Sequence, residues 1–223
     1  MHIEPGVVNG AKIALSYATA AGAATYGAKQ VWDSVKASGL GKLAARTVIA
    51  TAMVFSFFQI LPHFPVGVSE VHFILGSTLF LMFGAAPAAL ALAAGLLLQG
   101  VLVAPFDLPQ YGMNVTTLLA PLFALQYLAK RLIAPNTAYV DITYKQALAL
   151  STAYQGGVVA WVGFWAFYGQ GFGVENITAV SAFAASYMLV VVIEPVVDLA
   201  VLAAAKALRT TSPIFTSRLH SAA

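Results

Sequence analysis

Long apolar stretches alternate along this chain with short segments that hold most of its charged residues. A helix that crosses a membrane needs about 20 predominantly apolar residues. Seven stretches approach that length and predict helices over residues 7–28, 43–61, 71–83, 85–103, 113–132, 144–167 and 177–208. The third is short for a complete span, and a break at Gly84 separates it from the fourth. This pattern predicts an all-α protein, a polytopic membrane bundle of about seven transmembrane helices.

The composition excludes a soluble globular domain. Of the 223 residues, 60% are hydrophobic and only 9% are charged, whereas soluble domains contain roughly 25% charged residues. Cysteine is absent, so disulfide bonds and thiolate metal sites are impossible. We expect residues 1–208 to form a single integral membrane domain, followed by a short cytoplasmic tail at 209–223.

The placement of the basic residues indicates how the bundle is oriented. If the amino terminus lies outside, the inner segments are 29–42, residue 84, 133–143 and the tail. Ten of the 11 basic residues then lie in or beside those segments: Lys29, Lys36, Lys42, Arg46, Lys130, Arg131, Lys145, Lys206, Arg209 and Arg218. Because inner loops carry an excess of Lys and Arg, we predict a multi-pass protein of the inner (plasma) membrane. Its amino terminus is expected outside and its carboxyl terminus in the cytoplasm.

Each outer segment contains one acidic residue, and these are Glu4, Glu70, Asp107 and Glu175. Taken singly, each is an ordinary exposed loop residue. Together, with no basic residue in the same loops, they make the outer mouth attractive to cations.

Three of the four histidines, His2, His63 and His72, also belong to the outer side, whereas His220 lies in the tail and is assigned no role. A lone histidine is usually a hydrogen-bonded loop residue, but three on one face of so apolar a protein favour a shared role. The start MHIEPG lacks the basic and apolar regions of a signal peptide. We therefore expect it to belong to the working protein, with Met1 retained because His2 is too large for the aminopeptidase that removes it.

The position of His2 predicts a metal chelate. The imidazole of His2, its own main-chain nitrogen and the amine of Met1 can bind one metal through fused rings, which leaves one position in a square plane for another imidazole. Nitrogen ligands in a tetragonal arrangement point to copper(II) or nickel(II), with cobalt(II) close in the order of affinity. The chain therefore carries a candidate metal site at its amino terminus.

Several motifs resemble the CbiM/NikM family, the substrate-binding membrane subunits of energy-coupling-factor transporters for cobalt and nickel. The matching residues are Met1, His2, Ile3 and Gly6 at the start, Phe64, Pro65, His72 and Gly76 after the second helix, Gln99, Gly112 and Asn114 further on, and Glu194 in the last helix. The chain departs from the family at Val7, at His63 and in the segment APFDLPQ, which replaces a glycine-rich outer loop.

This resemblance implies that Met1, His2 and His72 hold Co²⁺ or Ni²⁺ as the transported ligand, in a system linked to cobalamin synthesis and without a cofactor. His63, Gln99 and Asn114 are candidates for additional ligands or for side chains that orient the imidazoles. Gln99 and Asn114 are alternatively polar contacts between helices.

The resemblance also implies partners, namely a transmembrane coupling subunit, two ATP-binding subunits and a small accessory membrane protein, all within lipid and without nucleic acid. The chain has no GxxxxGK[ST] phosphate loop, so ATP hydrolysis must come from a partner. Small residues at every fourth position in the first helix, such as Ala14, Ala18 and Gly22, either pack within the bundle or dock the coupling subunit.

Two other function classes compete with that of a metal transporter. A membrane enzyme is disfavoured because Ser69 and Ser77 lack the glycine-flanked context and the base of a serine nucleophile. A metal-independent structural or channel subunit is the remaining alternative. Glu194 and Asp198, four residues apart on the last helix, mark a pathway or a buried pairing, for example with Lys206 or a partner protein, or they cap a kink at Pro195.

Overall fold

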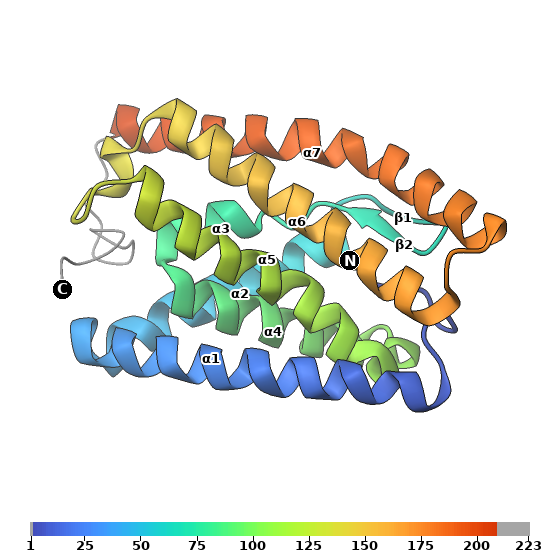
Figure 1. The fold of residues 1–223 in the computed structure, drawn as a ribbon. Coiled ribbons are helices and arrows are strands. Elements are labelled where there is room, and N and C mark those ends of the chain that lie inside the picture. The colour runs from blue at the N-terminus through green and yellow to red at the C-terminus, as the bar shows by residue number, and fades with distance from the viewer. Residues whose placement is uncertain (1, 209–223) are drawn as a thin grey trace.

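The computed structural model describes residues 2–208, and these form an elongated bundle with seven α-helices (Figure 1). The helices are α1 (Ala14–Ser38), α2 (Leu40–Ile60), α3 (Gly76–Phe83), α4 (Ala85–Leu102), α5 (Tyr111–Leu132), α6 (Tyr144–Gln170) and α7 (Val174–Leu208). A hairpin of β1 (His63–Val66) and β2 (Ser69–His72) and three short 3-10 helices, η1 (Gly10–Ile13), η2 (Pro105–Gln110) and η3 (Tyr139–Asp141), complete it. The predicted all-α class is confirmed. The predicted tail, 209–223, lies outside the described residues.

Five of the helical segments are long and apolar enough to cross a membrane. They are α2, α4, η2 joined to α5, α6 and α7. By contrast, α3 has eight residues, seven of them buried, so it is a core helix that ends inside the bundle. Residues 2–208 therefore contain seven helices and form a polytopic bundle as predicted, but only five of these helices are long and apolar enough to span a membrane.

The first helix begins and ends later than the sequence suggested. Residues 7–9 form a loop, and α1 continues through Lys29 and Lys36 to Ser38, where the sequence predicted an inner loop over 29–42. Gly39 alone separates α1 from α2, and its φ of 84° is a conformation that glycine adopts readily. The predicted loop was wrong because one glycine reverses the chain without any loop.

The segment predicted as the third helix contains part of a β-hairpin. In this hairpin His63 pairs with His72 and Val66 pairs with Ser69. Val71 and His72, which the sequence predicted as the start of a helix, are instead the end of β2, whose main chain pairs with β1. The helix α3 starts only at Gly76, after Leu75 adopts a left-handed φ of 55°.

The amino-terminal residues add a third, short strand to this hairpin. Ile3 forms a β-bridge with Ser69, and the main-chain nitrogen of Glu4 donates to the carbonyl of Val68 at 3.1 Å. Ile3 is completely buried. The start of the chain therefore lies inside the bundle, beside α5 and the hairpin (Figure 1).

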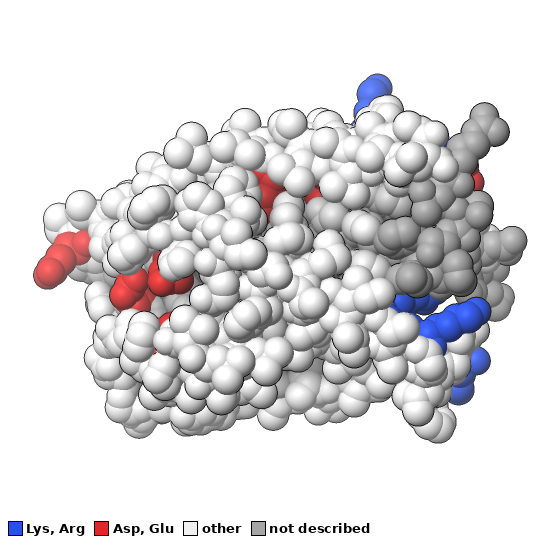
Figure 2. Space-filling model, turned by 180° about the vertical axis from the view of Figure 1, so that it is seen from behind, with Lys and Arg blue, Asp and Glu red and all other residues white. Residues whose placement is uncertain are grey.

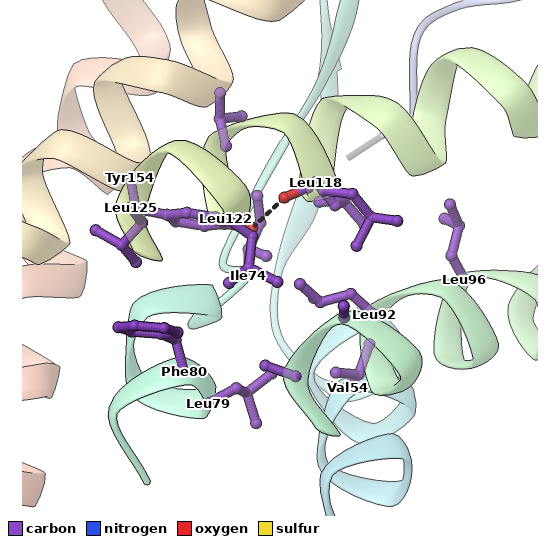
Figure 3. Close-up of a cluster of buried hydrophobic side chains, with 14 of the residues drawn as sticks. Val54, Ile74, Leu79, Phe80, Leu92, Leu96, Leu118, Leu122, Leu125 and Tyr154 are labelled. Carbon is purple, nitrogen blue, oxygen red and sulfur yellow. Dashed lines mark hydrogen bonds between the residues drawn. The ribbon is translucent and has the colours of Figure 1, made fainter. Parts of the chain in front are cut away.

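The core is formed by branched and aromatic side chains between α2, α3, α4, α5 and α6 (Figure 3). Tyr154 of α6 reaches across to the carbonyl of Leu118 in α5 at 3.4 Å. A side-chain carbon at Gly76 would lie 2.3 Å from the Tyr154 ring, so only glycine lets α3 start against α6. This packing places the segment 73–75 at the centre of the bundle.

Charged side chains separate between the two ends of the molecule. Seen from behind, several acidic groups gather at one end and others lie further along the molecule, whereas the basic groups in view lie toward the other end (Figure 2). The basic end includes the last turns of α1 and α5, with Lys36, Lys130 and Arg131. The acidic end contains the hairpin and the start of the chain.

We predict that Gly67→Ala destabilises the protein. Gly67 has a φ of 61° in the hairpin turn, and an added Cβ would lie 2.2 Å from the carbonyl oxygen of Ala179 in α7. Overpacking and a left-handed conformation together cost roughly 2–4 kcal/mol, which thermal unfolding in detergent would measure. Gly163→Ala is the matched control, because the space around Gly163 in α6 is open. Equal unfolding temperatures of the two variants would contradict the docking of the turn on α7.

Candidate metal centre at the amino terminus

His2 is buried, with 4% of its surface exposed, and its main chain is fixed from two sides. The carbonyl of His2 accepts hydrogen bonds from the main chain of Glu70 at 2.9 Å and from the hydroxyl of Ser69 at 2.8 Å. The next main-chain nitrogen, that of Ile3, donates to the side-chain oxygen of Asn114 in α5 at 2.8 Å. These contacts hold the imidazole of His2 in a defined place between the hairpin and α5.

His72, the last residue of β2, is also buried and presents one particular ring nitrogen. Its Nδ1 lies 2.9 Å from the carbonyl oxygen of Phe73. Because a carbonyl only accepts, Nδ1 carries the proton and Nε2 keeps its lone pair. This arrangement is typical of histidines that bind metals through Nε2.

The two imidazoles lie close together, with ring centroids 6.2 Å apart and planes at 80°. The aromatic ring of Phe58 packs 4.9 Å from His72 on another side. Within residues 2–208, no three His, Asp or Glu side chains are close enough to hold a metal ion as they stand. Any metal site here therefore needs main-chain nitrogens or a movement of these side chains.

Carboxylates surround His2. Its Nδ1 lies 2.7 Å from Asp107 of η2 and 3.5 Å from Glu70 of β2. Burial raises the pKa of the nearby Glu4 carboxyl above its usual value, the negative charges of Glu70 and Asp107 raise it further, and His2 opposes the shift. Three of the four predicted outer acids therefore converge on His2, whereas Glu175 is exposed at the start of α7.

The remaining predicted site residues occupy different positions. Met1 lies outside the described residues. Asn114 accepts a hydrogen bond from the main chain of Ile3, so it orients the main chain beside His2 and not the imidazole of His2. Gln99 is buried in α4, and its Oε1 has no hydrogen-bond partner among the described residues. His63 is the register partner of His72, but its side chain is exposed.

The sequence identified Asp107 and Glu70 only as charges of the outer segments. Nothing in the sequence of such a segment shows that it folds onto the amino terminus.

Glu194 of α7 holds the segment that follows His72. Its carboxylate accepts the main-chain N–H groups of Ile74 and Leu75, the second at 3.0 Å, and also the side-chain amide of Gln155. Tyr187 completes this group by donating to Gln155 at 2.7 Å. The buried acid therefore satisfies polar groups at the start of α3 and fixes the chain two residues beyond His72.

Asp198 lies one turn further along α7 and acts in the same way. It accepts the hydroxyl groups of Ser77 and Thr78 in the first turn of α3. The predicted pairing with Lys206 is not seen, because the ammonium of Lys206 donates to the carbonyl of Val140 at 2.6 Å. Both acids bind the first turn of α3, where the helix dipole also favours negative charge.

Two solved structures share this fold. The crystal structure of a truncated transition metal transporter has a TM-score of 0.68 over 91% of this chain and 97% of that chain, at 19% sequence identity. The crystal structure of a transition metal transporter has a TM-score of 0.68 over 93% of both chains, also at 19% identity. Curated protein sequences give no significant match. The fold therefore defines a helical multi-pass membrane protein built like these two transporters.

Residues 2–212 match the family described as the cobalt uptake substrate-specific transmembrane region, CbiM, and the chain belongs to that family. The resemblance found in its motifs is thereby confirmed. The protein is a multi-pass membrane component of transition metal uptake that works with other transport subunits, and it is not an enzyme. Cobalt or nickel is the transported substrate that fits this family.

We predict that Glu194→Ala destabilises the protein by about 3 kcal/mol or more, because buried donors at Ile74 and Leu75 lose their acceptor at 1–3 kcal/mol each. Thermal unfolding in detergent measures the loss. Ile193→Ala is the control, since it removes a side chain of similar size from the exposed face of the same helix. If both variants unfold at the same temperature, Glu194 does not anchor this segment.

Proposed function

We propose that this chain captures one Co²⁺ or Ni²⁺ ion through its amino terminus and His72 and passes it into the cell as the substrate-binding subunit of an energy-coupling-factor transporter. The ligands are the Met1 amine, the His2 main-chain nitrogen, the His2 imidazole and Nε2 of His72. The observation that carries the proposal is the pair of buried imidazoles, 6.2 Å apart between their centroids. The Met1 amine is assigned as a ligand from its chemistry, because Met1 lies outside the described residues.

Ring size decides which nitrogen of His2 takes part. The Met1 amine and the His2 amide nitrogen close a five-membered ring with the metal, and the amide nitrogen and Nδ1 close a six-membered ring. Nε2 lies on the far side of the imidazole and would need a larger, strained ring. The chelate therefore uses Nδ1 of His2, the nitrogen that now faces Asp107.

The two imidazole rings lie close enough to share one metal after a movement of about 2 Å. With metal–nitrogen bonds of about 2.0–2.1 Å, two imidazoles on one ion have centroids from about 4.4 Å apart, when adjacent, to about 6.4 Å, when opposite. The three-point chelate puts His72 adjacent to the His2 ring. We therefore expect the 6.2 Å separation to close by about 2 Å when the metal binds.

The separation of charges supports the orientation that the sequence suggested. Glu4, Glu70 and Asp107 surround the site at one end, and clustered carboxylates raise the local concentration of cations. The basic residues lie toward the other end (Figure 2), which the positive-inside rule assigns to the cytoplasm. We infer that the site faces outward from the plasma membrane, within one integral domain, residues 1–208, that ends in a cytoplasmic tail.

A groove on the surface gives the coupling subunit a place to dock. It has a volume of about 650 Å³ between α1, α4 and α5, and its α1 wall is formed by small residues that include Ala20, Ala24 and Gly27. Small side chains allow a partner helix to approach closely. We infer that the transmembrane coupling subunit binds there and connects this chain to two ATP-binding subunits, with an accessory membrane protein as a further partner.

The chelate predicts that the amino terminus is essential. One residue added before Met1, or His2→Ala, should abolish tight binding of both Co²⁺ and Ni²⁺, and His72→Ala should weaken it. Asn114→Ala should cost less, on the order of 10–100-fold. Metal affinity of each purified, monodisperse variant provides the test, with Gly163→Ala as a control in open space. A well-folded extended protein that binds as tightly as the native chain would falsify the amine as a ligand.

The groove predicts a separate effect on assembly. Ala24→Phe should fill the groove and prevent co-purification with the coupling and ATP-binding subunits, while metal affinity stays native. Ala18→Phe is the control and tests the other small-residue face, Ala14, Ala18 and Gly22, which is exposed on α1 outside the groove, and it should leave co-purification unchanged. Unchanged co-purification of the Ala24 variant, or ATP-driven uptake by the isolated chain, would overturn the proposed assembly.

A further inference from the structure

Asp107 occupies the position from which a ligand would reach a metal bound at His2. Its Oδ2 lies 2.7 Å from Nδ1 of His2, and only 6% of the surface of Asp107 is exposed. The carboxylate is carried by η2, directly before α5, so it belongs to a short helix and not to an extended loop. The two side chains line a cavity of about 10 Å³, roughly the space of one small atom.

The distance between these two atoms is one that a shared metal would require. Two ligands at about 2.0–2.2 Å from one ion and at right angles lie about 2.9 Å from each other. The 2.7 Å separation of Nδ1 and Oδ2 is close to this value. A metal on Nδ1 replaces the proton of this hydrogen bond, so the Asp107 carboxylate must turn off the axis of that bond to bind the ion from above the plane, a side-chain rotation that keeps the Nδ1–Oδ2 separation.

Charge gives an independent reason for the carboxylate to stay. A divalent ion bound to one deprotonated amide keeps a net charge of +1, and both His2 and Asp107 are more than nine-tenths buried. Burying an unpaired charge at a site shielded from water costs several kcal/mol of free energy. One carboxylate ligand makes the centre neutral.

We propose that Asp107 is a fifth ligand of the transported metal and that it shifts the preference of the site from nickel toward cobalt. The inference rests on the proposed function, because it assumes the chelate at His2. Four nitrogens in a plane suit nickel(II). An oxygen above that plane adds little to square-planar nickel(II), whereas high-spin cobalt(II) readily accepts five ligands.

The experiment compares Asp107→Asn with the native protein, using Co²⁺ and Ni²⁺ alone as probes. Asp107→Asn should weaken Co²⁺ binding at least tenfold and Ni²⁺ binding less, so that the ratio of the two affinities moves toward nickel. Glu175→Gln is the control, since it removes the same charge from an exposed position at the start of α7 and should leave both affinities unchanged. No loss for either metal overturns the assignment of Asp107 as a ligand, and equal losses overturn its effect on the preference between the two metals.

X-ray absorption of the native protein loaded with Co²⁺ tests the same point without a variant. Because nitrogen and oxygen ligands look alike to this method, the number of ligands decides: five light-atom ligands around Co²⁺ support the proposal, whereas four overturn it and leave Asp107 outside the ligand shell. Failure of the proposed function looks different. In that case the native protein binds neither metal, or binds both as tightly after His2→Ala, whatever residue stands at position 107.

Discussion

Pairing of the first residues with β2 is the interaction on which the site depends. Ser69 and Glu70 both hold the carbonyl of His2, and Asn114 holds the nitrogen of Ile3. Chain termini are usually frayed because nothing offsets the entropy of ordering them. Here the main-chain hydrogen bonds and the complete burial of Ile3 oppose that entropy. The result is an imidazole at position two whose place is set by the sheet and not by a flexible tail.

The membrane interior imposes the second constraint, since unsatisfied main-chain groups are costly there. Residues 73–75, between β2 and α3, belong to no helix or strand, and they lie against α7. Glu194 satisfies this segment by accepting the buried main-chain N–H groups of Ile74 and Leu75, and Asp198 accepts the hydroxyl groups of the first turn of α3. The buried acids are thus explained by the irregular segment opposite them, which in turn positions His72.

Much of the architecture could be predicted from residue pattern, because a membrane span needs a long apolar run and leaves that run visible. The predicted starts or ends of α2, α4, α5, α6 and α7 agree with the structure within a few residues. The hairpin was missed because apolar residues of a short strand look like those of a buried helix. The end of α1 was missed because basic residues suggested a loop where Gly39 alone makes the turn.

The sequence by itself determined the class of protein, the family and the candidate ligands, since apolar length, charge bias and a histidine at position two are properties of residue order alone. Only the tertiary structure decided which side chains meet. Asp107 and His2 are more than 100 positions apart, and Glu194 reaches the main chain that follows His72 from the last helix. Contacts of that kind depend on how η2, α5 and α7 pack around the amino terminus, and packing is a property of the whole bundle.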